Sequence, residues 1–234
     1  GDAVDAAVAT AFALGVVHPF ASGIGGGGFA VVHRADGTQI ALDFREVAPK
    51  ASTARMFLDS KGAVVPDLSR LGPFAAGVPG EVAGLYELHR RYGKLPWATV
   101  IAPAIKLARE GFVITEIMHY KMKAALYDLR TSVIGPFLMQ SGEKPRSAGM
   151  KMRLPPLART LERIAQHGAK DFYTGILAQD MVESIRMGGG LITLEDLANY
   201  KVKERAVLKA EVLGYDILTM PPPSSGGLVL IQVL

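Results

Sequence analysis

An Asp-Gly step between two β-type runs is the feature that most restricts how this chain folds. Asp36-Gly37 separates the apolar run at residues 29–33 from residues 39–45, in which apolar and polar side chains alternate. Asp-Gly is strongly favoured in tight hairpin turns, and a period of two is typical of a strand with one buried face. The sequence therefore predicts an antiparallel β-hairpin over residues 29–45.

The second strand of this hairpin ends by presenting a single arginine, Arg45. The alternation places Asp43 and Arg45 on the polar face of the strand, so we expect Asp43 to orient Arg45. A guanidinium held in this way can bind both oxygens of a carboxylate and so fix its orientation. We interpret Arg45 as a candidate binder of an anionic group. On the local pattern alone, an ordinary salt bridge of Arg45 with Asp43 or Glu46 stays open.

Further motifs lie on both sides of the Arg45 segment and extend from the first residues to the last. In chain order the set is Gly1-Asp2-Ala3-Val4-Asp5-Ala6-Ala7-Val8-Ala9, Gly25-Gly26-Gly27-Gly28-Phe29, Asp43-Phe44-Arg45-Glu46, Gly188-Gly189-Gly190-Leu191-Ile192-Thr193-Leu194-Glu195-Asp196-Leu197 and Met220-Pro221-Pro222-Pro223-Ser224-Ser225-Gly226-Gly227. This ordered set resembles the large subunit of the gamma-glutamyltransferase (gamma-glutamyl transpeptidase) family of N-terminal-nucleophile hydrolases. The resemblance covers essentially the whole chain.

The resemblance implies a fold and a role for Arg45. The implied fold class is α/β (α+β), the four-layer αββα sandwich of N-terminal-nucleophile hydrolases, with the hairpin supplying part of one sheet. In the family, the arginine of the Asp-Phe-Arg-Glu motif binds the α-carboxylate of the gamma-glutamyl group, and here that position is Arg45. Arg45 is therefore our candidate substrate-binding residue.

The resemblance also implies that the nucleophile lies outside this chain. In the family it is a threonine at the N-terminus of a small subunit, exposed when a zymogen cleaves itself, and that region would follow Leu234. We therefore expect no catalytic residue in this chain and a heterodimer with the small subunit. Residues 1–234 would be an incomplete large-subunit domain, truncated at both ends and inactive alone.

The expected activity is that of a gamma-glutamyltransferase or glutathione hydrolase. Such an enzyme cleaves gamma-glutamyl amides such as glutathione and transfers the glutamyl group to water, an amino acid or a peptide. The alternatives are a related acylase (a cephalosporin-type acylase or a poly-gamma-glutamate transpeptidase) and a non-catalytic relative. Arg45 favours glutamyl substrates over those of a cephalosporin-type acylase.

Composition agrees with part of a globular enzyme. With 49% hydrophobic residues among 234 and a mean hydropathy of +0.23, the chain can bury a sizeable core. The apolar stretch at residues 6–17 is too short to span a membrane, and we interpret it as a buried core helix. The absence of cysteine excludes disulfides, thiol catalysis and thiolate metal sites. The resemblance implies a periplasmic or secreted protein.

The positive charge does not indicate a nucleic-acid partner. The net charge is +4, but lysine and arginine are scattered among acids, as in the segment from Lys201 to Arg205. A nucleic-acid-binding surface requires a basic stripe. We interpret the segment 201–205 as solvated mixed-charge surface.

The glycine cluster and the histidines do not predict a cofactor or a metal. Residues 23–28 satisfy the spacing of a dinucleotide-binding loop, but a helix precedes them and a strand follows, which is the reverse of the required order. We expect these glycines to allow close backbone packing. The histidines show no metal-ligand spacing. We therefore expect no metal and no other cofactor.

The remaining motifs predict helix starts and further elements. Ser224-Ser225 lacks the Gly-x-Ser-x-Gly pattern of a hydrolase nucleophile, so we expect one of these serines to cap a helix that begins near Gly227. Thr193 and Asp196 resemble a capping box, and Asp2 with Asp5 also suits a helix start. The pattern predicts helices at 81–92, within 95–130, and at 154–167 and 177–187, with strands within 207–220 around Gly214.

Overall fold

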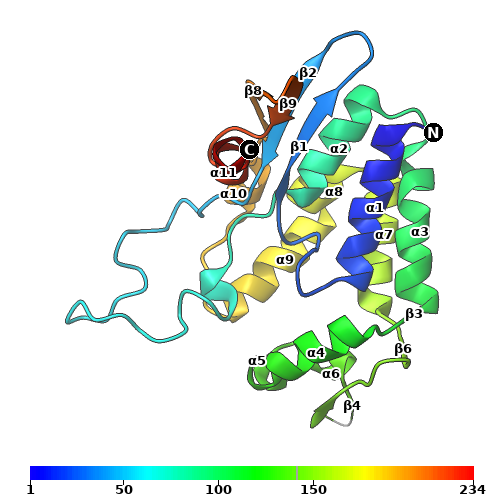
Figure 1. Ribbon diagram of the computed structural model, residues 1–234. Coiled ribbons are helices and arrows are strands. Elements are labelled where there is room, and N and C mark those ends of the chain that lie inside the picture. The colour runs from blue at the N-terminus through cyan, green and yellow to red at the C-terminus, as the bar shows by residue number, and fades with distance from the viewer. Residues whose placement is uncertain (141) are drawn as a thin grey trace.

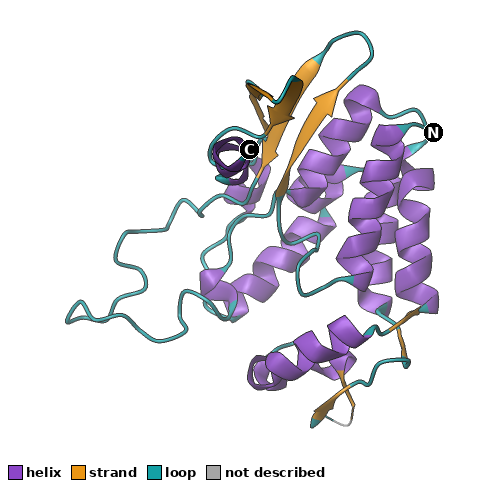
Figure 2. Ribbon diagram, in the orientation of Figure 1, coloured by secondary structure: helices purple, strands orange, loops and turns teal. Residues whose placement is uncertain are grey.

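The computed structural model describes residues 1–140 and 142–234 and combines a small antiparallel sheet with a layer of helices (Figures 1 and 2). The helices are α1 (Ala3–Val17), α2 (Glu81–Tyr92), α3 (Trp97–Glu110), α4 (Glu116–Ala124), α5 (Leu126–Thr131), α6 (Gly135–Leu138), α7 (Pro155–His167), α8 (Ala169–Thr174), α9 (Ile176–Met187), α10 (Leu194–Ala198), α11 (Gly226–Val233) and the 3-10 helix η1 (Pro73–Ala75). The strands are β1 (Gly28–His33), β2 (Gln39–Phe44), β3 (Phe112–Val113), β4 (Met139–Gln140), β5 (Lys144–Pro145), β6 (Lys151–Met152), β7 (Lys203–Arg205), β8 (Leu208–Val212) and β9 (Tyr215–Thr219).

The predicted hairpin is confirmed. Strands β1 and β2 pair antiparallel from Gly28 opposite Phe44 to His33 opposite Gln39. In the turn, Gly37 has a φ of +84°, which glycine adopts without a steric penalty. The Asp36 carboxylate accepts the backbone N–H of Thr38 at 2.9 Å and closes the turn.

Strand β2 differs from the expected half-buried strand because both of its faces are buried. Strand β7 pairs with its second edge, which makes β2 the central strand of the three-stranded sheet. Ala41 lies opposite Arg205, whose guanidinium binds the carboxylate of Asp43. Lys203 and Glu204 of β7 are exposed, as the interpretation of residues 201–205 as solvated surface predicts, whereas Arg205 is half-buried against Asp43.

Trp97 joins the helices that pack on one another beside the sheet. Its ring meets the rings of Phe12 from α1 and Tyr86 from α2 edge-on, at centroid distances of 5.5 and 5.1 Å. The indole N–H donates to the backbone carbonyl of Ile164 in α7 at 2.9 Å. Because Trp97 itself begins α3, one side chain connects four helices, and α2 in turn packs on β1 and β2.

Helix α1 buries only one stripe, although it is apolar on all sides. Val8, Phe12 and Val16 are buried at helical spacing, whereas Leu14 is exposed. The predicted core helix is therefore confirmed for this stripe, which packs on α2 and α3, whereas the side that carries Leu14 is exposed. The predicted capping at its start is confirmed, since Asp2 and Asp5 form a capping box.

Asp5 also fixes the connection between α2 and α3. Its buried carboxylate accepts the backbone N–H groups of Lys94 and Leu95 at 3.0 and 3.2 Å. Burial opposes ionisation of Asp5, but the backbone donors of Asp2, Lys94 and Leu95, with His89 nearby, lower the pKa of this carboxyl. A residue predicted as a helix cap therefore also holds a loop about 90 residues away in sequence.

A long loop and a short hairpin extend from the sheet and the helical layer, as does the part of the chain that contains α4, α5 and α6 (Figure 1). The segment from residue 48 to residue 72 forms a long loop (Figure 1). The strands predicted around Gly214 are β8 and β9, which pair as an antiparallel hairpin beside α11. Helix α11 begins at Gly226 with Ser225 at the N-cap position, as expected for a serine, but the Ser225 side chain makes no capping hydrogen bond. The Ser224 hydroxyl instead accepts the backbone N–H of Gly226 at 3.3 Å. No helix among the described residues is long and apolar enough to cross a membrane.

Gly84 lies inside α2, where helix propensity alone predicts that alanine would stabilise the protein. The packing around Gly84 predicts the opposite. A Cβ on Gly84 would collide with the ring of Phe44. Alanine at an exposed helix position is about 1 kcal/mol better than glycine. Gly84→Ala should nevertheless lower the free energy of unfolding by about 2 kcal/mol, because overpacking against the sheet outweighs propensity. Urea denaturation measures this change.

Gly226→Ala is the matched control for Gly84→Ala. Gly226 also lies in a helix, but a Cβ at this position would come no closer than 3.5 Å to its nearest neighbour, the Ser224 hydroxyl. The free energy of unfolding of this variant should change by less than about 0.5 kcal/mol. A Gly84→Ala protein as stable as the control would contradict the close packing of α2 on β2.

Candidate functional site

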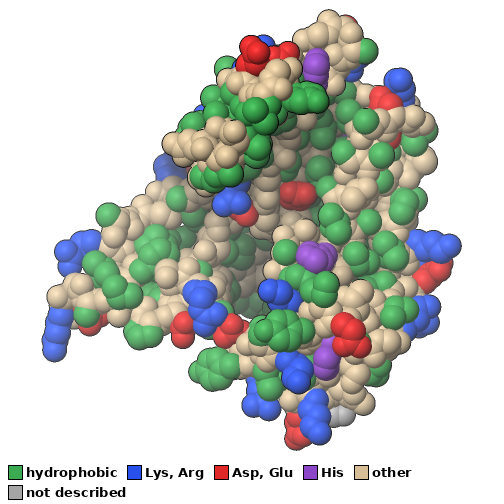
Figure 3. All heavy atoms as spheres, viewed as in Figure 1, with side chains coloured by type: hydrophobic (Ala, Val, Ile, Leu, Met, Phe, Trp, Pro, Cys, Tyr) green, Lys and Arg blue, Asp and Glu red, His purple; other side chains and the backbone are tan. Residues whose placement is uncertain are grey.

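Arg45 lies directly after β2, at the rim of an open cleft of about 560 Å³. The glycine-containing loop between α1 and β1 forms one wall, and Arg45, Glu46 and Glu81 supply the charged groups. The Arg45 side chain is 55% exposed, so its guanidinium is accessible to a ligand. Figure 3 shows the face of the molecule hollowed between the sheet and the helices, with side chains of both charges on the walls.

Side chains hold both backbone polar groups of Arg45. Its N–H donates to Oδ1 of Asp43 at 3.1 Å, and its carbonyl oxygen accepts the hydroxyl of Tyr200 at 2.9 Å. The other oxygen of Asp43, Oδ2, accepts from Arg205 at 2.7 and 2.8 Å. Asp43 therefore orients Arg45 as predicted, but through its main chain. Of the two salt bridges that the sequence left open for Arg45, the one with Asp43 does not form, because the Asp43 side chain pairs with Arg205.

The guanidinium of Arg45 makes weak contacts with its neighbours. Its Nε lies 3.5 Å from Oε2 of Glu46, and its carbon lies 5.9 Å from the ring centre of Phe29. An ion pair at this distance and exposure contributes about 1 kcal/mol or less. A bidentate bond to a ligand carboxylate is stronger, so Arg45 can exchange this contact for a ligand.

Two glycines allow three segments of backbone to meet behind Arg45. A Cβ on Gly27 would collide with the carbonyl oxygen of Phe44, and a Cβ on Gly80 would collide with that oxygen and with the hydroxyl of Tyr200. The Gly26 carbonyl accepts the N–H groups of Gly80 and Glu81 at 2.8 and 2.9 Å. Close packing is therefore the role of this part of the glycine cluster, as expected.

Glu81 is a charged group of the cleft that sequence reasoning treated only as a helix start. It is the first residue of α2, where a negative charge is normally favourable. Burial and the neighbouring Glu46 raise the pKa of Glu81 to about 7. Among the described residues, the buried Oε2 of Glu46 has no hydrogen-bond partner. Glu81 and Glu46 are therefore neighbouring carboxyls beside Arg45, whose Nε lies 3.5 Å from Oε2 of Glu46.

Tyr200 and Tyr173 form a stacked pair beneath this turn. Their ring centres lie 5.6 Å apart with an interplanar angle of 16°. The Tyr173 hydroxyl donates to the carbonyl of Pro79 at 2.9 Å and accepts the N–H of Ala83 at 3.2 Å. Burial raises the pKa of both phenols well above the usual value, so both remain neutral hydrogen-bond donors.

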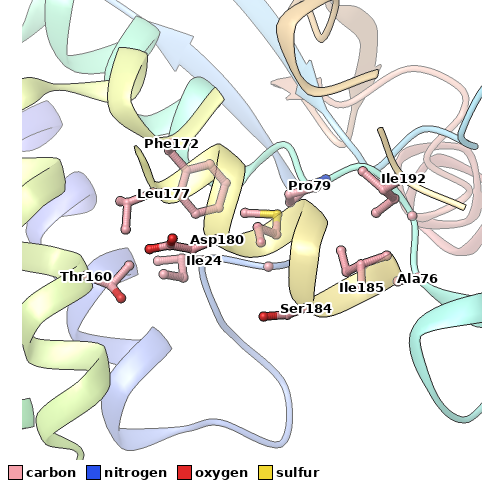
Figure 4. A pocket seen from close by; sticks show the side chains of 13 residues that line it. Ile24, Ala76, Pro79, Thr160, Phe172, Leu177, Asp180, Ser184, Ile185 and Ile192 are labelled. Atoms are coloured by element: carbon pink, nitrogen blue, oxygen red, sulfur yellow. The ribbon is translucent and has the colours of Figure 1, made fainter. Parts of the chain in front are cut away.

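A second cavity, of about 450 Å³, lies between α7, α9 and the loops at residues 24–25 and 76–79. Phe172, Leu177 and Ile185 contribute apolar side chains to it, and Thr160, Asp180 and Ser184 contribute oxygen atoms (Figure 4). The residues that line it include no lysine or arginine. It offers no counter-charge to an anionic ligand, so we place the candidate site at Arg45.

Other residues weighed in the sequence lie outside the Arg45 cleft. Ser224 and Ser225 lie at the start of α11. Thr193 and Asp196 form the predicted capping box of α10, in which Asp196 also accepts the N–H of Lys50 at 2.8 Å. The described residues contain no group of three or more His, Asp or Glu side chains placed to bind a metal ion.

The sequence profile described as gamma-glutamyltranspeptidase matches residues 1–234. The chain belongs to this family. It is 46% identical over 236 residues to a glutathione hydrolase proenzyme of Pseudomonas aeruginosa, covering 100% of this chain and 41% of the relative. It is 44% identical over 234 residues to glutathione hydrolase 2 of Arabidopsis thaliana, again covering 100% of this chain and 40% of the relative.

Solved structures of the family share the fold. The crystal structure of the gamma-glutamyltranspeptidase of Helicobacter pylori superposes with a TM-score of 0.95 at 45% identity, covering 99% of this chain and 67% of that one. The α/β fold class of this family, predicted from the motifs, is therefore confirmed. The chain spans about 40% of the length of the curated relatives that it matches.

The raised pKa of Glu81 makes stability depend on pH in a defined direction. A carboxyl ionises near pH 4.5 in the unfolded chain but near 7 in the fold, so ionisation costs free energy that grows above pH 4.5 and is fully present above about pH 7. Glu81→Gln removes this cost. The variant should be more stable than the parent by about 3 kcal/mol at pH 8, with the difference vanishing near pH 4.5.

Thermal unfolding between pH 5 and pH 8 measures this difference, with Glu116→Gln as the control. Glu116 is also the first residue of a helix, α4, but it is exposed. Its substitution should give a small stability change that is constant between pH 6 and pH 8. A Glu81→Gln difference that is equally constant over that range would show that Glu81 does not titrate there.

Proposed function

We propose that this chain is the part of a gamma-glutamyltransferase or glutathione hydrolase that binds the α-carboxylate of the gamma-glutamyl donor. Arg45 forms a bidentate pair with this carboxylate, and the pair selects glutamyl groups over other acyl groups. The proposal rests on one observation. An accessible arginine, weakly paired in its side chain but held at both backbone groups, lines an open cleft.

In the proposed reaction, the remainder of the protein supplies the nucleophile. A threonine hydroxyl attacks the gamma-carbonyl of the donor, and the free α-amine of that threonine accepts the proton as general base. The amine product leaves, and water or an acceptor amino acid or peptide then takes the glutamyl group. Arg45 does not enter the bond changes. It orients the donor so that the gamma-carbonyl faces the nucleophile.

The partner we propose is a small subunit released from the same precursor. Two findings support it. The relatives from bacteria are described as proenzymes of which this chain covers about 41%. Helix α11 also presents an apolar surface without a covering element in the described chain. Its exposed apolar residues, with the one that follows, are Leu228, Val229, Leu230, Val233 and Leu234. Burial of such a helix requires another element.

We also propose that the protein works in the periplasm or outside the cell, as implied by its resemblance to secreted family members. Cell fractionation with an antibody against this chain tests the location. Recovery with cytoplasmic marker enzymes alone would contradict it.

Removal of the Arg45 guanidinium should weaken donor use in the full-length protein. Arg45→Ala should lower kcat/KM for a gamma-glutamyl anilide by about 30- to 700-fold, because loss of a charge-assisted bidentate contact costs about 2–4 kcal/mol. Mass spectrometry of each protein shows whether the precursor has cleaved itself, which separates loss of binding from loss of maturation.

Arg34→Ala is the matched control for this measurement. Arg34 is also an exposed arginine of the hairpin and pairs with Asp36, but it lies at the turn and does not line the cleft. Its kcat/KM should stay within about twofold of the parent. A cleaved Arg45→Ala protein with near-normal kcat/KM would remove Arg45 from the donor site. A parent protein that cleaves itself but has no activity on the anilide would indicate a different acyl substrate.

A further inference from the structure

We propose that Tyr200 is a positioning residue for the donor carboxylate, acting through the backbone of Arg45. This inference rests on the proposed role of Arg45 and adds to it a residue 155 positions away in sequence. The hydroxyl of Tyr200 donates to the Arg45 carbonyl at 2.9 Å and so sets the direction in which the guanidinium meets the carboxylate.

The position of Arg45 relative to the sheet explains why a side chain must hold it. The pairing of β1 with β2 ends at Phe44, and the pairing of β7 with β2 ends at Asp43. Arg45 therefore lies one residue beyond the sheet ladder. The carboxylate of Asp43 binds its N–H, and the hydroxyl of Tyr200 binds its carbonyl. Loss of the Tyr200 hydroxyl leaves Arg45 held by a side chain only at its N–H, with its carbonyl free to rotate.

Tyr200 is itself well fixed, which is required of a positioning group. Its ring stacks on Tyr173, whose hydroxyl bonds to two backbone groups of the segment around Gly80. The hydroxyl of Tyr200 lies so close to Gly80 that a Cβ there would collide with it. The stacked pair therefore connects the start of α2 to the turn that carries Arg45.

The geometry of a bidentate contact makes it sensitive to such a change. Two parallel N–H to oxygen bonds require the guanidinium and carboxylate planes to align, within about 0.5 Å and 10–20°. A small rotation of the Arg45 peptide is multiplied along its long side chain. We therefore expect loss of the Tyr200 hydroxyl to weaken recognition of the carboxylate while leaving the chemistry at the gamma-carbonyl intact.

The test uses the full-length protein and two donors that differ only at the group in question. One is a gamma-glutamyl anilide, and the other is the same compound with its α-carboxylate converted to a neutral amide. Tyr200→Phe keeps the stacked ring and removes the hydroxyl. For the first donor, KM should rise about tenfold with kcat within about twofold of the parent. For the amide donor, both constants should be unchanged, so the preference for the carboxylate falls.

Tyr173→Phe is the matched control because it removes the other hydroxyl of the same stacked pair. That hydroxyl bonds to Pro79 and Ala83 and does not contact Arg45. The variant should have a lower melting temperature and an unchanged preference between the two donors. If Tyr200→Phe does not fold, Tyr200→His, which also lacks the hydroxyl, should show the same fall in preference.

Arg45→Ala, measured with the same two donors, tests the donor-binding role of Arg45 separately from the positioning role of Tyr200. If Arg45→Ala keeps the preference for the carboxylate, the proposed function fails. If Arg45→Ala abolishes the preference and Tyr200→Phe retains it, only the positioning role of Tyr200 is overturned. A Tyr200→Phe protein whose kcat/KM falls equally for both donors also overturns that role. So does one that has a lower melting temperature but unchanged kinetic constants.

Discussion

The arrangement of the candidate site depends on one buried carboxylate, that of Asp43. It lies in the central strand of the sheet, where a charge without partners would cost several kcal/mol. One of its oxygens binds Arg205 of β7 and the other binds the N–H of Arg45. The same group therefore joins β7 to β2 and fixes the residue at which β2 leaves the sheet. Arg45 can hold a ligand because its own side chain is not needed to neutralise Asp43.

A second constraint acts from the opposite side of the Arg45 turn. Gly27 and Gly80 bring the loop after α1 and the start of α2 against the backbone of Phe44, and Tyr200 closes this contact. The close approach also buries Glu81 next to Glu46, which explains the raised pKa of Glu81. Tight backbone packing and a perturbed carboxyl pair are thus two results of one arrangement, and both lie beside an accessible guanidinium.

The sequence predicted those features that depend on local patterns. The hairpin, the helix at residues 81–92, the capping boxes and the close packing of the glycines follow from turn chemistry, periodicity and spacing. Arg45 stood out because it ends an alternating strand. The partners of Arg45 and Asp43 could not be predicted in this way. Tyr200 and Arg205 are 155 and 162 residues distant in sequence, and an alternating charged segment such as 201–205 has the pattern of exposed surface. The pKa of Glu81 depends on burial by those same distant contacts.

The most direct test of the account is a crystal structure of the full-length protein with glutamate bound. The account predicts that the α-carboxylate forms two hydrogen bonds to the guanidinium of Arg45, with the Tyr200 hydroxyl still on the Arg45 carbonyl and the Asp43 carboxylate still on Arg205. Glutamate bound with its α-carboxylate away from Arg45, or an Arg45 side chain that keeps its contact with Glu46 in the complex, would contradict it.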